Sequence, residues 1–243
     1  MFNSLRIIIF LLFVLVNILL CGIIHTITFS FGSKIQYLIA NYFHKFFLLI
    51  LGINIKVNKK KDYSNKNYMI ICNHYTALDY FILRILFPNS YTVVKSDMLR
   101  ANTSIFIKIL LLPLQYLFFN QGMLISYVRG NTKSGLECQK DIIEKIKSHN
   151  IIIFPEGTST RNGIPKSFKK GLFYTAYKNK IPIIPISLKY KKDIGINPGD
   201  KLNLSEWINE TAKLEIHDEI NPEDFNNIDE LHKHSFEVVA KKL

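Results

Sequence analysis

Cysteine and tryptophan are scarce in this chain, whose 243 residues include three cysteines and one tryptophan. Cys21, Cys72 and Cys138 are an odd number that cannot pair fully, and none has the Cys-x-x-Cys spacing of zinc or dithiol redox sites. The Gly-x-Ser-x-Gly elbow of α/β-hydrolases is absent, and so is a glycine-rich nucleotide-binding loop. The sequence therefore predicts no metal site and no cofactor.

Acidic residues are also few, with 19 Asp and Glu against 31 Lys and Arg, for a formal charge of +12. Such an excess favours anionic lipid headgroups or other polyanions as partners, and the sign alone does not choose between them. With 48% apolar residues the chain has ample material for a core. Its length suits one globular domain plus an anchor.

The longest apolar run lies near the amino terminus. Residues 7–24 are apolar except for Asn17 and Gly22, which is about the length needed to cross a bilayer. We expect a transmembrane helix at about 5–29 rather than a cleaved signal peptide, because only Arg6 precedes the run and no small-x-small site follows it. Six lysines between residues 34 and 61 then place the bulk of the chain in the cytosol.

A second apolar stretch, residues 37–51, is broken by polar residues at helical spacing. It predicts an amphipathic helix at about 34–52, which either lies in the membrane interface or forms a core helix of the soluble domain. We place the boundary after a membrane-anchoring part, residues 1–58. Residues 59–243 are then the catalytic domain.

Short apolar, β-branched runs alternate with helical patterns in the remaining sequence, which predicts an α/β fold. Their apolar character is typical of a central, mostly parallel sheet flanked by helices. The expected strands are 68–72, 91–94, 123–127, 151–154 and 183–188, and the clearest helix is 134–148. Residues 105–119 are a membrane-facing or acyl-binding surface, or a core helix kinked at Pro113. The tail after Tyr190 is expected to complete the sheet, with Trp207 packed inside and His217 on the surface.

The segment NHYTALD, residues 73–79, holds a histidine five positions before a carboxylate. Imidazole is the natural general base at neutral pH, and a carboxylate on its other nitrogen fixes the tautomer and stabilises the imidazolium. A turn from the strand into a helix brings the two side chains together. His74 is therefore the candidate base and Asp79 its support; a structural, helix-capping role is the alternative for His74.

The segment FPEGTSTR, residues 154–161, follows an expected strand, and its Pro and Gly force a turn with exposed backbone amides and hydroxyls. Such a turn suits an oxyanion or a phosphate. Glu156 is expected to orient the acceptor or to hold an arginine. Cationic contacts to a phosphate are expected from Arg129, Arg161, Lys166, Lys169 and Lys170.

These segments resemble the conserved blocks of the lysophosphatidic acid acyltransferase family of glycerolipid acyltransferases, over about residues 68–188. The four blocks occur in order as NHYTALD, GMLISYVR (122–129), FPEGTSTR and IPIIPISL (181–188). The resemblance implies an α/β acyltransferase domain behind a membrane-embedding helical element, here residues 1–55. It also implies that His74 is the base, that Asp79 supports it, and that the third block binds the glycerophosphate acceptor.

By the same resemblance, Arg129 matches a phosphate-binding arginine, Lys95 of KSDML matches a lysine near the substrates, and Pro185 falls on the acyl-donor side. We expect the substrate-binding residues to be Asn73, Lys95, Arg129, Glu156, Gly157, Thr158 and Arg161. One departure puts Arg161 in question. Family members often have arginine directly after FPEGT, where this chain has Ser159.

The expected function is acyl transfer from acyl-CoA or acyl-carrier protein to the free hydroxyl of lysophosphatidic acid, giving phosphatidic acid. The expected partners are membrane phospholipids, a lysophospholipid acceptor and an acyl thioester donor, with no nucleic acid. The alternatives are acylation of another lysophospholipid, a hydrolase that uses the same base, and a catalytically silent, membrane-anchored module that binds anionic lipid. Turnover in a His74→Ala variant separates an enzyme from a binding module.

Overall fold

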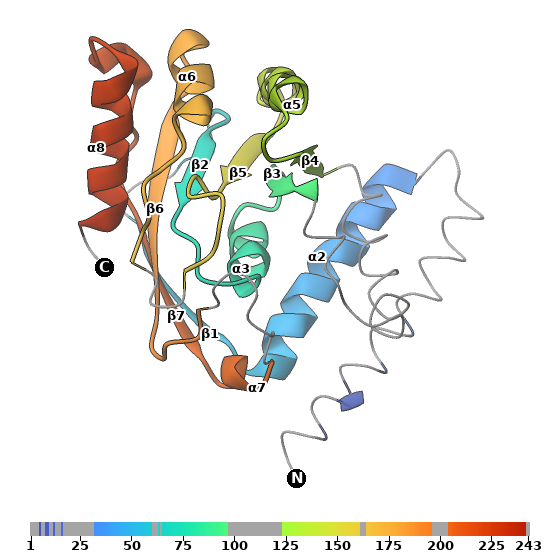
Figure 1. Cartoon of the computed structure of the whole chain (residues 1–243). Helices are drawn as coiled ribbons and strands as arrows, with labels where there is room; N and C mark the ends of the chain where they lie inside the picture. The colour runs from blue at the N-terminus through green and yellow to red at the C-terminus, as the bar shows by residue number, and fades with distance from the viewer. Residues whose placement is uncertain are drawn as a thin grey trace.

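A seven-stranded sheet with helices on both faces forms the described part of the chain (Figure 1). The computed structural model describes residues 32–59, 63, 65–96, 123–160, 164–195 and 204–241, with single positions at 5, 8, 9, 12 and 16. The strands are β1 (Asn54–Lys59), β2 (Met69–Cys72), β3 (Ser90–Lys95), β4 (Leu124–Tyr127), β5 (Asn150–Ile153), β6 (Ile183–Tyr190) and β7 (Thr211–Ile216). The helices are α2 (Gly32–Leu51), α3 (Leu78–Leu86), α5 (Thr132–Lys145), α6 (Lys170–Lys178), α7 (Leu204–Trp207) and α8 (Ile228–Ala240), with a short 3₁₀ helix, η2 (Pro222–Asp224).

The strand order is β1-β7-β6-β2-β5-β3-β4, and every neighbouring pair is parallel except β6 and β7. This confirms the expected α/β fold with a mostly parallel sheet between helices. Strands β6, β2, β5, β3 and β4 all run in one direction, so their carboxyl ends lie at the same edge of the sheet. In open α/β sheets that edge is where ligands bind.

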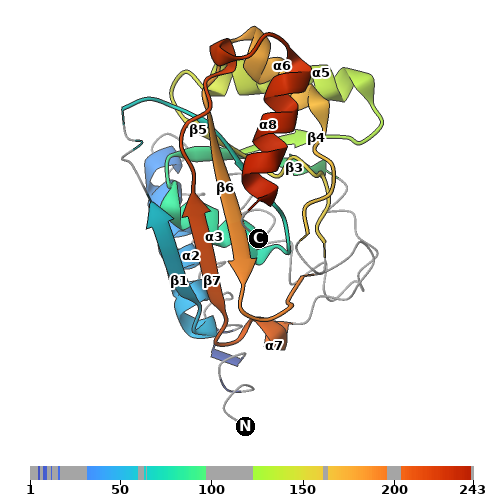
Figure 2. The same cartoon turned by 90° about the vertical axis from the view of Figure 1, so that its left-hand side faces the viewer.

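Alternation along the strands divides the core between the two faces of the sheet. In β2, Ile70 and Cys72 pack with apolar residues of α2 and α3, whereas Met69 and Ile71 pack with those of α5, α6 and α8. Figure 2 shows α8 on one side of the sheet and α2 on the other. All four β2 side chains are buried, as expected for a strand covered on both faces.

Asparagine side chains cap the amino termini of two helices. Asn131 precedes α5 and its side chain accepts a hydrogen bond from the amide of Ser134. Asn227 precedes α8, accepts from the amide of Glu230 and donates to that residue's carboxylate. Each cap satisfies a helix-terminal amide that has no partner within the helix.

Helix α2 packs its carboxyl-terminal half into the domain. Phe47, Leu48 and Leu51 are buried against α3 and the sheet, whereas Tyr42 and Leu49 on the opposite side are exposed. Strand β1 follows directly and pairs in parallel with β7, so the boundary expected at residue 58 falls inside a strand of the sheet. The sequence of β1 carries alternating polar residues, which hid it from the search for apolar runs.

Two expectations fall on residues that the structure does not describe. The span predicted at about 5–29 lies outside the described residues apart from single positions, and residues 105–119 lie outside them entirely. Among the helices that are described, none combines the length and apolarity needed to cross a membrane.

The tail does complete the sheet, through β7, and Trp207 is buried as expected. The surface position expected for His217 is wrong. Its side chain is buried and its Nε2 lies 2.7 Å from Ser187 Oγ. Ser187 of β6 gives the buried imidazole a hydrogen-bond partner, which offsets the loss of contact with water. No local sequence pattern indicates that pairing.

Candidate active site

His74 and Asp79 meet at the carboxyl edge of the sheet, in the turn between β2 and α3. Strand β2 ends at Cys72 and α3 begins at Leu78, so the chain reverses within a few residues. His74 Nδ1 lies 2.8 Å from Asp79 Oδ2. Because Nδ1 faces the carboxylate, Nε2 is the ring nitrogen that remains for a substrate.

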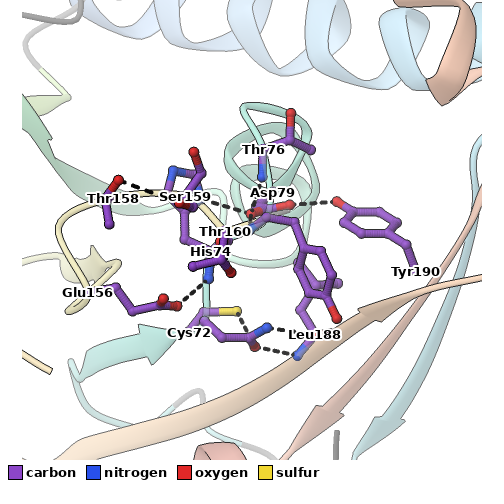
Figure 3. A network of polar contacts seen from close by, with 12 residues as sticks. Cys72, His74, Thr76, Asp79, Glu156, Thr158, Ser159, Thr160, Leu188 and Tyr190 are labelled. Carbon is purple, nitrogen blue, oxygen red and sulfur yellow. Dashed lines mark hydrogen bonds and ion pairs between the residues drawn. The ribbon is translucent and has the colours of Figure 1, made fainter. Parts of the chain in front are cut away.

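The carboxylate of Asp79 is completely buried and bonded on both oxygens. Besides His74, Oδ2 accepts hydrogen bonds from the backbone amides of Tyr75 (2.6 Å) and Thr76 (3.0 Å), and Oδ1 accepts from the hydroxyl of Tyr190 (2.7 Å). Figure 3 shows Asp79 between His74 and Tyr190, which comes from the end of β6. Four donors therefore hold one carboxylate, and its position in the first turn of α3 also suits a negative charge.

The imidazole of His74 is held by the neighbouring FPEGTSTR loop as well. Its ring stacks on Phe154, with centroids 4.3 Å apart and an angle of 24° between the planes. The backbone carbonyl of His74 accepts a hydrogen bond from the amide of Thr160 (3.0 Å), and the backbone amide of His74 donates to Glu156 Oε1 (2.9 Å). The third block of the sequence thus fixes the first.

Glu156 is buried where the FPEGTSTR loop meets the β2–α3 turn. Its side chain is buried; Oε1 binds the amide of His74 and Oε2 binds the amide of Lys166, each at 2.9 Å. Burial raises the pKa of Glu156, and the two amide hydrogen bonds oppose that shift. The expectation that Glu156 orients the acceptor or holds an arginine is corrected here, because both oxygens are used to join two backbone segments.

Asn73 is also committed to the backbone. It is fully buried, its amide nitrogen donates to the carbonyl of Leu188 (2.9 Å), and its oxygen accepts from the amide of Leu188 (2.8 Å). The expected substrate contact by Asn73 is therefore replaced by a link between the β2–α3 turn and β6.

Gly157 and Arg129 form the next contact along the edge. Gly157 has φ of +67°, a left-handed conformation that glycine adopts readily. The guanidinium of Arg129, which follows β4, donates to the carbonyl of Gly157. Arg129 is exposed, and a guanidinium has five N–H donors, so donors remain for a ligand while this bond sets the position of the group.

A cavity of about 610 Å³ opens beside His74. Its lining combines apolar side chains with three cationic side chains, His74 and the third-block turn. The apolar residues include Ala77, Phe81, Val93, Val94, Leu124, Ile153, Phe154 and Leu172; the cations are Lys95, Arg129 and Lys169; the turn contributes Gly157, Thr158 and Ser159. His74 therefore lies where an apolar chain and an anionic group can both reach it.

The structure brings His74, Lys95, Arg129, Gly157 and Thr158 to this cavity. Asn73, Asp79 and Glu156 lie behind it, and Arg161 is outside the described residues. Within the described ranges, no group of three His, Cys, Asp or Glu side chains is arranged to hold a metal ion.

Two residues of the site, Phe154 and Tyr190, were missed in the sequence. Phe154 was named only as part of a block, although an aromatic residue next to the motif was available as a stacking partner. Of the three lysines expected as phosphate contacts, Lys169 lines the cavity, whereas Lys166 and Lys170 do not. Tyr190 has no local signal, because it reaches Asp79 across 111 positions of sequence.

Comparison with known proteins gives a consistent result. A family model described as Acyltransferase matches residues 54–189. The 1-acyl-sn-glycerol-3-phosphate acyltransferase of Saccharomyces cerevisiae is 28% identical over 155 residues, 62% of this chain and 48% of that protein. The one from Borreliella burgdorferi is 29% identical over 194 residues, 72% of this chain and 74% of that protein. The chain spans about half the length of the yeast protein and 42% of the similar protein from Cocos nucifera.

The fold is shared with a solved structure. The crystal structure of the 1-acyl-sn-glycerophosphate (LPA) acyltransferase PlsC from Thermotoga maritima matches with a TM-score of 0.72 and 19% identity, over 99% of this chain and 95% of that one. The family match begins at β1 and ends in β6, so it contains both turns of the site and the strands that hold them. With more than half of its length in that match, the chain belongs to the Acyltransferase family.

Proposed function

We propose that this protein transfers a fatty acyl group from an acyl thioester to the free hydroxyl of 1-acyl-sn-glycerol-3-phosphate, giving phosphatidic acid. The observation that carries the proposal is the 2.8 Å contact between His74 Nδ1 and Asp79 Oδ2 at the wall of a cavity lined by both apolar and cationic side chains. The names of the relatives support the same acceptor.

The chemistry requires one base and a place for the negative charge. Nε2 of His74 removes the proton from the acceptor hydroxyl as its oxygen attacks the thioester carbonyl, and Asp79 stabilises the imidazolium. The tetrahedral intermediate then collapses, its C–S bond breaks, and the leaving thiolate receives from the His74 imidazolium the proton that came from the acceptor hydroxyl. Hydrogen bonds from the Thr158 turn are the proposed support for the oxyanion. No acyl-enzyme is needed.

Two of the cationic side chains that line the cavity suit the acceptor phosphate. Arg129 and Lys169 both line it beside Gly157, and a guanidinium binds phosphate with two parallel hydrogen bonds. Ser159 has no charge to offer at the place where family members often have arginine. We therefore assign phosphate binding to Arg129 and Lys169, and contact with an acyl chain to the apolar side chains of the cavity.

We also propose that the chain is anchored to a membrane by its amino-terminal part, with the catalytic domain in the cytosol. The apolar run of residues 7–24 and the lysines that follow it support this arrangement. The test is extraction of membranes with alkaline carbonate, followed by protease treatment of intact cells and of inverted vesicles. Release by carbonate, or cleavage of the domain from outside the cell, contradicts it.

Activity is tested with the detergent-solubilised full chain, by following free thiol release from a long-chain acyl-CoA and identifying the lipid product by mass. Acceptors are lysophosphatidic acid, lysophosphatidylcholine and monoacylglycerol. Thiol release that needs lysophosphatidic acid and yields phosphatidic acid is the expected result. Release without an acceptor indicates a thioesterase, and a preference for another lysolipid moves the assignment to that acceptor.

A matched pair of histidine variants tests the base. His74→Ala should lower kcat at least about a hundredfold, the lower end of what a general base contributes. His234→Ala is the control, because His234 is an exposed residue of α8. Equal activity of the two variants would refute the role of His74. Binding of phosphatidic acid vesicles should be the same in both.

A further inference from the structure

The side chain of Tyr190 reaches the carboxylate of Asp79 from the far side of His74. Its hydroxyl lies 2.7 Å from Asp79 Oδ1, the oxygen that His74 does not contact. Tyr190 is the last residue of β6 and is 5% exposed. It is not among the residues that line the cavity, so the described structure gives it no direct access to a substrate.

The direction of this hydrogen bond follows from the surroundings. A carboxylate accepts, so the phenol must donate, and it can do so only while protonated. Burial and the neighbouring Asp79 raise the pKa of Tyr190 well above its usual value. The hydroxyl is therefore a permanent donor at any pH at which the protein works.

The ring is held as firmly as the hydroxyl. Tyr75 packs edge-on against Tyr190, with centroids 5.3 Å apart and planes at 89°. Two residues before Tyr190, the backbone carbonyl and amide of Leu188 are both hydrogen-bonded to the side chain of Asn73. The end of β6 and the β2–α3 turn therefore form one rigid unit that contains Asp79.

We propose that Tyr190 is a positioning residue of the reaction: its hydroxyl fixes the orientation of the Asp79 carboxylate so that Oδ2 stays on Nδ1 of His74. This inference rests on the proposed acyl transfer. Without the hydroxyl, Oδ1 has no other protein donor in the described structure, and the carboxylate is free to turn about its Cβ–Cγ bond. His74 then loses part of its support when it becomes positively charged.

The loss also has a predictable dependence on pH. A buried carboxylate with one hydrogen-bond donor fewer is less stable in its ionised form, so the variant's Asp79 takes up a proton at higher pH than that of the wild type. A protonated Asp79 does not support the imidazolium of His74, so the acid limb of the activity profile moves upward. The titratable groups around Asp79 are Cys72 of β2, His74 and Tyr75 of the turn, Glu156 of the third block, and Tyr190 of β6.

Tyr190→Phe removes the hydroxyl and keeps the ring. We expect kcat to fall about tenfold to a hundredfold, the effect of one hydrogen bond to a charged group, while KM for thioester and acceptor stays within about twofold. The acid limb of the kcat profile should move up by about one pH unit. Unchanged kcat, or a change in KM alone, overturns the proposal.

Tyr63→Phe is the matched control. The Tyr63 hydroxyl donates to the carbonyl of His217 at 2.8 Å and its ring is buried, so the substitution removes a hydrogen bond of similar length away from the cavity. It should lower the melting temperature without moving the pH profile. Should both variants lose kcat equally with unmoved profiles, Tyr190 acts only through stability and the proposal is refuted.

A second measurement tests the proposal in case the Tyr190→Phe variant folds poorly. Site-specific 3-fluorotyrosine at position 190 keeps the ring and makes the hydroxyl a stronger donor, so the acid limb should move to lower pH, opposite to the Phe variant. An unmoved profile overturns the proposal. If the wild-type chain transfers no acyl group to any acceptor, the proposed function itself fails. If the wild type is active and substitution of Tyr190 changes neither kcat nor the pH profile, this inference alone is refuted.

Discussion

The side chain of Asn73 binds both the backbone carbonyl and the backbone amide of Leu188. Its nitrogen donates to the carbonyl at 2.9 Å, and its oxygen accepts from the amide at 2.8 Å. Strands β2 and β6 pair in parallel up to Cys72 and Ile186, and the asparagine continues that pairing where the β2 backbone turns away. The residue before His74 is thereby tied to the strand that carries Tyr190.

Asn73→Ala should lower the free energy of unfolding by about 2–4 kcal/mol, because two buried backbone groups of Leu188 lose their partner. Urea denaturation monitored by circular dichroism measures this loss. Asn89→Ala is the control, since the exposed Asn89 makes one long contact of 3.3 Å with Ser148. A difference of less than about 1 kcal/mol between the two variants would contradict the role assigned to Asn73.

Glu156 predicts how stability depends on pH. Burial raises the pKa of this carboxyl above its ordinary value of 4.5, so the folded chain holds the proton more tightly than the unfolded chain. The unfolded state therefore loses its proton first as pH rises, and stability falls between 4.5 and the folded pKa. Above that window the contribution of Glu156 no longer changes.

Glu156→Gln removes this titration. Denaturation of the wild type and the variant from about pH 4 to about pH 7 should show the wild type losing stability relative to the variant as pH rises. At every pH the variant also carries an amide NH₂ facing either the amide of His74 or that of Lys166, which should lower kcat through displacement of His74. A wild-type advantage that grows with pH would contradict the assigned direction of the shift.

The five strands expected from the sequence are all present. Three of them, β2, β5 and β6, are almost completely buried, and a strand covered on both faces is an apolar run that stands out in the sequence. Strands β1 and β7 were not located, since they lie toward one edge of the sheet and alternate polar with apolar residues. The pairing of His74 with Asp79 followed from local spacing. By contrast, Leu188 and Tyr190 of β6 and Glu156 of the loop after β5 reach the turn from far along the sequence, and only the sheet order places them there.

Gly157 has a conformational reason to be glycine. A methyl group at this position meets ordinary contacts of 3.6 Å with Arg129 and Tyr127, so space is sufficient, but φ of +67° is unfavourable for alanine. Gly157→Ala should cost about 1 kcal/mol or somewhat more in stability. Because the turn carries Thr158 into the cavity, kcat should fall as well.

Gly130→Ala provides the comparison for this strain. Gly130 has φ of +77° and nothing within 4 Å of an added methyl group, and it does not line the cavity. Its loss of stability should match that of Gly157→Ala, with kcat retained. Melting curves and initial rates of the two variants decide the point, and an equal loss of kcat in both would show that general strain, rather than the site, is responsible.

Arg129 predicts which acceptor the site selects. Its guanidinium is exposed at the cavity and bonded to the carbonyl of Gly157, which holds it in place for an anion. Arg129→Gln should raise KM for lysophosphatidic acid about tenfold or more, because a charge-assisted contact to phosphate is lost. Initial rates at varied acceptor concentration measure this change.

Two comparisons separate phosphate binding from support of the turn. Monoacylglycerol has no phosphate, so Arg129→Gln should leave its use nearly unchanged if the arginine acts on phosphate, and should impair both acceptors if the arginine only holds Gly157. Lys133→Gln removes one positive charge from the exposed first turn of α5, outside the cavity, and should leave KM for either acceptor unchanged. An equal rise of KM in both variants would assign the effect to overall charge and remove Arg129 from the phosphate site.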